Sequence, residues 1–122
     1  MFVPRGLLRR KPPAQSLGEP EQDDLERLAE LREQGSRLHL PHPVRGFVAF
    51  EAEAEARQAA DHLRKEGYRC AIRALQDGTW LTTAVIEVVP TPGAITRLRE
   101  QFTVVASAHG GTYRGWDAPV VY

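Results

Sequence analysis

GGTYRGWDAPVV, residues 110–121, lies almost at the end of the chain, where a loose tail would need neither aromatic residues nor an apolar run. Its β-forming and aromatic residues predict a last strand over residues 112–121. Pro119 cannot donate a backbone hydrogen bond, so this strand is expected at the edge of a sheet. The fold therefore depends on which earlier strand this ending pairs with.

A strand followed by a helix begins at residue 44. VRGFVAF, residues 44–50, is rich in β-forming and aromatic residues and predicts a strand. Residues 51–67 place alanines and Leu63 on one side of a helix, and Gly67 is its expected end. The alanine stripe predicts a helix that packs close to a sheet.

Two further strands and a second helix follow. Residues 68–75 and 79–89 predict strands, and Asp77-Gly78 between them is the signal of a two-residue hairpin turn. Thr91 is the expected cap of a helix that ends at Gly110. Apolar residues on that helix recur at the spacing of one buried face. They are Ile95, Leu98, Phe102 and Val105.

The order from residue 44 onward is βαββαβ, which predicts an α+β, ferredoxin-like sandwich. Right-handed crossovers give a four-stranded antiparallel sheet in spatial order 4-1-3-2. The two most apolar strands then take the centre, and the second and fourth strands take the edges. The last strand pairs beside the first, where Tyr113 and Trp116 are expected to supply packing area.

An N-terminal arm and an extra helix precede this core. Residues 1–21 are rich in proline and predict a flexible arm, and residues 22–122 form the predicted domain. The arm contains the basic stretch GLLRRK, which is interpreted as a solvated tail or as a contact for an acidic partner or a membrane surface, although its two leucines offer too little apolar area for stable membrane attachment.

The extra helix is expected over residues 24–34. Asp23 or Asp24 is its expected cap, and Gly35 is its expected end. LHLPHP, residues 38–43, is expected to be irregular because of its two prolines.

Composition excludes several classes of protein. The 122 residues suit one domain, and 16 basic residues balance 16 acidic ones, which argues against wholesale phosphate-driven nucleic-acid binding. Cys70 is the only cysteine, so an internal disulfide is excluded. No apolar run has membrane-spanning length, and a cytoplasmic location is expected.

The chemistry-bearing residues predict no catalytic constellation. His39 and His42 could form a metal pair, but exposed loop histidines are the favoured interpretation. Ser107 and His109 lack an orienting acid, and Cys70 is expected to be a buried, inert thiol. We therefore expect no enzyme activity, no cofactor and no metal.

One face of the sheet is expected to stay open, because both core helices cover the other. Arg69 and Arg73 share a face of the second strand, and Arg45 or Arg114 could join them. Such a surface could bind an acidic protein segment or only deter aggregation at a sheet edge.

The same face could instead bind RNA. Tyr113, Phe47 or Trp80 would then supply aromatic rings on which bases stack. The extra N-terminal helix could also cover this face, which would remove the platform.

The chain also resembles the family of RraB, the regulator of ribonuclease activity B. The resemblance rests on the ending GGTYRGW and on EQDDLERLAEL, FVAFEAEAEARQAADHLRKEGY, GTWLTTA and PTPGAITRLREQF, in this order, over about residues 20–121. The family fold is of the ferredoxin-like kind. The resemblance implies a non-enzymatic regulator, since founding members bind the C-terminal scaffold region of ribonuclease E and change RNA processing.

Two departures from the family pattern concern charge. The founding type is strongly acidic, whereas this chain is neutral, and Arg114 stands where the family commonly carries an acidic residue. An acidic protein can mimic RNA against a basic scaffold, and this chain is poorly equipped to do so. The family supplies no catalytic residues.

The leading prediction is a regulator that binds a ribonuclease E-like enzyme or another degradosome component. Its expected contact residues are Arg69, Arg73, Tyr113, Arg114 and Trp116. The alternatives are a single-stranded RNA-binding module and a small-ligand-sensing module. No membrane partner is expected, and the oligomeric state is left open.

Overall fold

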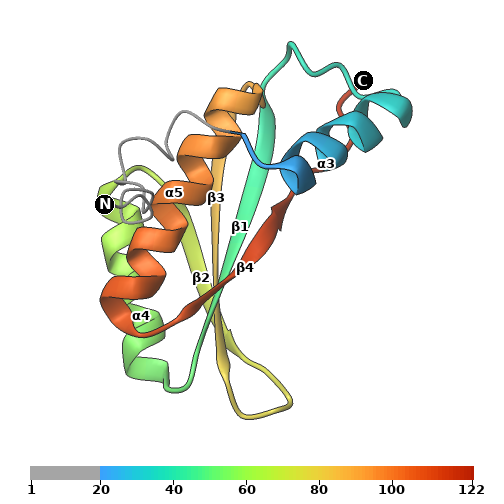
Figure 1. Cartoon of the computed structure of the whole chain (residues 1–122). Helices are drawn as coiled ribbons and strands as arrows, with labels where there is room; N and C mark the ends of the chain where they lie inside the picture. The colour runs from blue at the N-terminus through green and yellow to red at the C-terminus, as the bar shows by residue number, and fades with distance from the viewer. Residues whose placement is uncertain (1–19) are drawn as a thin grey trace, which may run out of the picture.

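The computed structural model describes residues 20–122 as an open four-stranded sheet with helices packed against it (Figure 1). The elements are α3 (Gln22–Glu33), β1 (His42–Phe50), α4 (Glu53–Lys65), β2 (Arg69–Ala74), β3 (Trp80–Val88), α5 (Pro92–His109) and β4 (Thr112–Asp117). The strand order is β2-β3-β1-β4, all antiparallel, which confirms the predicted ferredoxin-like arrangement. The predicted arm, residues 1–21, lies outside the described residues apart from Pro20 and Glu21.

The core lies between the sheet and the pair α4 and α5. Alternate residues of the central strands are buried against the helices, among them Val44 and Val48 of β1. The alanine stripe of α4 lets that helix pack close to β3. As a result, the hydroxyl of Thr82 donates a hydrogen bond of 3.0 Å to the carbonyl oxygen of Ala56. The buried hydroxyl thereby gains the acceptor that it needs.

Phe102 places α5 directly over the centre of the sheet. Its ring fills the space above Gly46 of β1, where any side chain would overlap it. The ring also meets Tyr68 and Tyr113 edge-on, with centroids 5.2 and 5.9 Å apart. The glycine in VRGFVAF is therefore required by the close approach of a helix.

A β-bulge in β4 explains the glycine of the sequence YRGW. Tyr113 pairs with Val48 and Trp116 with Gly46, so two residues of β4 stand opposite one residue of β1. Gly115 in the bulge has φ +103°, a conformation that L side chains rarely adopt. Residues three apart in a regular strand face opposite ways, but the bulge turns both aromatic side chains toward the helices.

Asp24 connects the extra helix α3 to this core. Its carboxylate accepts a hydrogen bond from Arg99 Nε of α5 at 3.0 Å and one from Trp116 Nε1 of β4 at 2.9 Å. Only 9% of the Asp24 side chain and 13% of the Arg99 side chain are exposed, so the ion pair is largely desolvated. The predicted capping role is wrong, since the helix begins at Gln22 and Asp24 lies inside it.

The position of α3 decides between the two alternatives that the sequence left open for the sheet face opposite α4 and α5. Asp24 of α3 bonds to Arg99 of α5 and to Trp116 of β4, whose side chain lies on the same side of the sheet as α4 and α5. Therefore α3 lies beside β4 and the start of α5 (Figure 1). It packs on α5 and does not cover the opposite side of the sheet.

The start of β1 and the end of β4 differ from the predicted strand bounds. β1 already begins at His42 and includes Pro43, which is tolerated because β4 joins the ladder only from Arg45 onward. β4 ends at Asp117, before Pro119, and the remaining residues leave the sheet.

The chain end is nevertheless held. Val121 N donates to Ser36 Oγ at 2.9 Å, and Arg37 N donates to the carbonyl oxygen of Val121 at 2.8 Å. These bonds attach the last residues to the segment that follows α3.

The predicted two-residue hairpin is wrong by one residue. Leu75 N donates to the carbonyl oxygen of Thr79 at 2.8 Å, which leaves a loop of three residues between them. Gly78 in this loop has φ +89°, as a three-residue hairpin with a left-handed last position requires. Asp77 stabilises the loop by accepting hydrogen bonds from the backbone N–H and the hydroxyl of Thr79.

We expect Asp24→Ala to lower the free energy of unfolding by about 3 kcal/mol, because it removes the buried acceptor of the Trp116 N–H and the shortest ion pair of the largely buried Arg99. Urea denaturation measures the change. Asp61→Ala is the control, since it removes only the exposed ion pair with Arg64 and should cost within about 0.5 kcal/mol. Equal effects of the two substitutions would contradict the anchoring role of Asp24.

Candidate functional site

The side of the sheet that faces away from α4 and α5 is the candidate functional surface, and we call it the open face. No helix of residues 20–122 packs on it. Strand alternation and pairing place on it Arg69, Ala71 and Arg73 of β2, Leu81, Thr83, Val85 and Glu87 of β3, Pro43, Arg45, Phe47 and Ala49 of β1, and Thr112 and Asp117 of β4. Its centre is therefore mostly apolar, and arginines stand along the β2 edge.

Arg45 is already engaged within the open face. It pairs with Asp117 across the β1–β4 ladder through two hydrogen bonds of 2.8 Å, and these bonds raise the pKa of the guanidinium. Its guanidinium carbon also lies 5.5 Å from the ring centroid of Phe47. Arg45 thus neutralises one of the acidic groups on this face.

Arg69 and Arg73 differ from Arg45 because they have no partner among the described residues. Both are exposed, and their side chains point to the same side of β2. Val85 and Leu81 of β3 stand directly opposite them. Two unpaired cations beside an apolar centre are suited to an acidic and partly apolar partner.

Arg114 lies in the β4 bulge, exposed and without a hydrogen-bond partner among residues 20–122. Its charge reaches the β2–β3 hairpin, because it contributes to lowering the pKa of Asp77 after the larger effect of the Thr79 hydrogen bonds. The opposite charges of Arg114 and Asp77 therefore interact across the space between β4 and the hairpin.

The structure does not bring all the predicted contact residues together. Arg69 and Arg73 lie on the open face, whereas Tyr113 and Trp116 face the helices. Tyr113, Arg114 and Trp116 instead line a cavity of about 460 Å³ beside the start of α3. Among the five predicted contact residues, Arg114 alone borders both the open face and this cavity. The bulge in β4 separates the two aromatic residues from the open face, because it turns both of their side chains toward the helices.

The cavity beside α3 is electrically balanced. Its charged lining consists of Glu21, Asp23, Asp24, Arg27, Arg99 and Arg114. The Arg27 guanidinium lies 5.7 Å from the Trp116 ring centroid, and the hydroxyl of Tyr113 is buried without a hydrogen-bond partner. Burial raises the pKa of Tyr113. These contacts support the anchor of α3 rather than a preference for one ligand charge.

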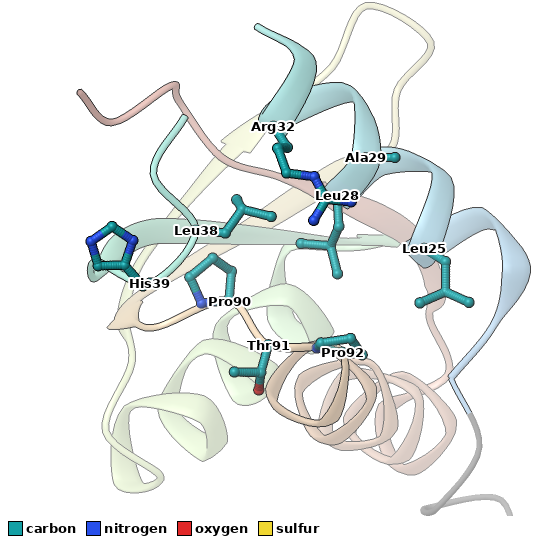
Figure 2. A pocket seen from close by; sticks show the side chains of 9 residues that line it. All are labelled: Leu25, Leu28, Ala29, Arg32, Leu38, His39, Pro90, Thr91 and Pro92. Atoms are coloured by element: carbon teal, nitrogen blue, oxygen red, sulfur yellow. The ribbon is translucent and has the colours of Figure 1, made fainter. Parts of the chain in front are cut away.

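An apolar groove of about 360 Å³ lies between α3 and the start of α5. Figure 2 shows Leu25 and Leu28 of α3 on one side of it, and Pro90 and Pro92 on the other. The hydroxyl of Thr91 is already used, because it caps α5 by accepting from Ala94 N. Specific small-molecule sites need a few converging polar groups, and this groove offers little of that kind.

Of the two histidines predicted to be exposed in a loop, His39 is exposed in a turn as expected, but the prediction for His42 is wrong. His42 is fully buried in β1 rather than exposed in a loop. Its Nδ1 lies 2.7 Å from the Leu40 carbonyl oxygen and therefore carries the proton, so its Nε2 accepts from the Ser36 hydroxyl at 2.6 Å. Ser36 in turn accepts from Val121 N. The pair is fully satisfied and attaches the chain end to β1.

A second histidine contact has no counterpart in the sequence analysis. His62 Nδ1 of α4 lies 3.3 Å from His109 Nε2 of α5, and Glu66 lies 3.4 Å from His62 Nε2. The two histidines are 47 positions apart, so no local spacing signals their contact. Within residues 20–122 no group of three or more side chains is arranged to hold a metal ion.

No helix in the described part of the chain has the length and apolar character needed to cross a membrane.

Comparison with known protein families identifies the family of this chain. The family model of the regulator of ribonuclease activity B, RraB, matches residues 21–118. The match covers α3 and the whole sheet, and so it includes both the anchor of α3 and the open face. Among curated proteins none matches the chain.

Cys70 was expected to be buried, but it is only partly buried on the helix side of β2, and it gives a test of the burial pattern of this strand. Burial raises the pKa of its thiol, and the nearby Arg64 offsets only part of this effect. At pH 8 we expect alkylation by iodoacetamide to be several-fold slower in the folded protein than in urea, and to accelerate as the pH rises toward the raised pKa. Equal rates in the folded and unfolded protein would show that the thiol does not face the core.

Proposed function

Since the chain belongs to the RraB family, we propose that it regulates RNA turnover by binding a ribonuclease, and that it does so without catalysis of its own. The partner is a ribonuclease E-like enzyme or another component of an RNA-degradation complex, met in the cytoplasm. The regulator changes the activity of this partner by occupying a surface of it.

The observation that carries this proposal is the open face, with its apolar centre and the unpaired Arg69 and Arg73. Protein interfaces combine an apolar core with a polar rim, and arginine is enriched in them. At this surface Arg45 and Asp117 neutralise each other and Glu87 of β3 adds one negative charge, whereas the two β2 arginines have no ion-pair partner among residues 20–122, so the face keeps a net positive charge. The surface therefore favours an acidic patch on the ribonuclease.

Single-stranded RNA is the less favoured partner. Sheet-based RNA modules stack two or three bases on aromatic side chains. Among the described residues Phe47 is the only aromatic side chain on the open face, because Trp80 and Tyr113 turn toward the helices. The arginines alone could contact phosphates, but the stacking platform is missing from this face.

The charge of the open face also distinguishes this chain from an RNA mimic. Mimicry of RNA would require an acidic surface that docks on a basic scaffold. Arg69, Arg73 and Arg114 give this surface the opposite sign. We infer that this chain regulates through a different contact from the founding members while it keeps their fold.

The proposal predicts that the purified protein binds its host's ribonuclease E-like enzyme and slows cleavage of a fluorescent RNA substrate. The double substitution Arg69→Glu and Arg73→Glu should weaken the binding at least tenfold, because it reverses both unpaired charges. Arg97→Glu on the exposed side of α5 is the control and should leave the affinity unchanged.

Binding must survive treatment of the ribonuclease preparation with a nuclease that removes RNA tethers. A complex that disappears after this treatment would indicate RNA binding instead. No binding to any ribonuclease or degradation component would contradict the proposal.

A further inference from the structure

β2 presents an unpaired backbone edge whose geometry the hairpin determines. Leu75 N bonds to the Thr79 carbonyl oxygen, so Leu75 directs its backbone groups toward β3. Since these directions alternate along an antiparallel strand, Cys70, Ile72 and Ala74 direct theirs away from β3. The Cys70 carbonyl accepts from Arg64 at 3.2 Å, which agrees with its outward direction.

The outward groups of Ile72 and Ala74 have no strand partner in the described part of the chain, because β2 is the last strand of the sheet. An exposed edge of this kind can accept another strand. The other edge is less suitable, since the bulge at Gly115 interrupts the regular pairing of β4.

We propose that the β2 edge binds an extended acidic segment of the partner protein as a fifth, antiparallel strand. The inference rests on the proposed function, in that the partner is a protein, and it adds the element that is bound and the manner of binding. Arg69 and Arg73 favour an acidic segment by charge, and the outward N–H and C=O groups of Ile72 and Ala74 form backbone hydrogen bonds with it.

Strand geometry predicts the pattern of the segment. Arg69 and Arg73 would face the incoming strand in pairs that share no backbone hydrogen bond, where opposite side chains lie closest. They are four positions apart on one face, with the small Ala71 between them, so the segment needs acidic residues four apart. The residues of the segment next to each acidic residue point to the helix side of the sheet. There they lie opposite Cys70 and Ile72, which are partly buried, so apolar residues are expected at these positions of the segment.

A second copy of this chain fits the same edge poorly. Antiparallel pairing of two β2 strands would gather four arginines on one face, where like charges lie opposite or diagonal to one another. Arg64, which lies at this edge beside Cys70, is paired with Asp61 and so does not offset this repulsion. Charge therefore favours an acidic partner over self-association.

The experiment uses the full chain and a fluorescent peptide, Ser-Glu-Val-Thr-Val-Glu-Ser, measured by fluorescence anisotropy. A peptide with lysine in place of both glutamates should bind at least tenfold more weakly. A peptide N-methylated at the amides that would pair with β2 keeps its charge, and it should also lose at least tenfold in affinity because it cannot form the ladder.

Matched variants of the chain test the same claim from the other side. Arg69→Gln together with Arg73→Gln should weaken binding of the acidic peptide, whereas Arg97→Gln should not. Amide hydrogen exchange should slow at Ile72 and Ala74 when the peptide is bound. Equal binding of the N-methylated peptide, or protection confined to another element, would overturn the proposal.

The outcome is separable from that of the proposed function. If the peptide fails while the ribonuclease is still bound and inhibited, strand addition is wrong and the regulatory function stands. In that case the β2 arginines only guard the edge against aggregation or contact a folded surface.

Discussion

Asp24 holds α3 against the rest of the molecule through two buried hydrogen bonds, one to Arg99 of α5 and one to Trp116 of β4. Because both acceptor oxygens are largely shielded from water, loss of the carboxylate would remove the buried acceptor of the indole N–H and the shortest of the ion pairs of Arg99. The position of α3 follows from these bonds. The helix lies on the side of α5 and leaves the opposite side of the sheet uncovered, and this open face is the surface available to a partner.

Local periodicity was sufficient to predict most of the fold. The βαββαβ order, the Thr91 cap and the helix end at Gly110 depend on neighbouring residues, and the structure confirms them. The role of Asp24 could not be predicted in this way, since its partner Trp116 lies 92 positions away. The buried contact of Ser36 with His42 depends equally on how the chain end returns to the segment after α3.

The candidate site was predictable to the extent that it depends on strand alternation. Arg69 and Arg73 lie two pleats apart in a regular strand, so their common face follows from spacing alone. Tyr113 and Trp116 were expected on the same contact surface, but the bulge at Gly115 turns them to the helices. A bulge depends on the register between two strands, which no single segment specifies. Tyr113 and Trp116 of the ending GGTYRGW thus stabilise the fold, and Arg69 and Arg73 are the predicted contact residues that lie on the open face.

The chain belongs to the RraB family, and yet its open face carries a net positive charge. The proposed function requires that the open face and the β2 edge, rather than the helices, contact the ribonuclease. Amide chemical-shift mapping of the labelled protein with the ribonuclease E-like enzyme of its host tests this most directly. The account predicts that the largest changes fall on β2 and on the outward residues of β3, around Ala71 and Thr83. Changes confined to α4 and α5, with β2 unaffected, would contradict it.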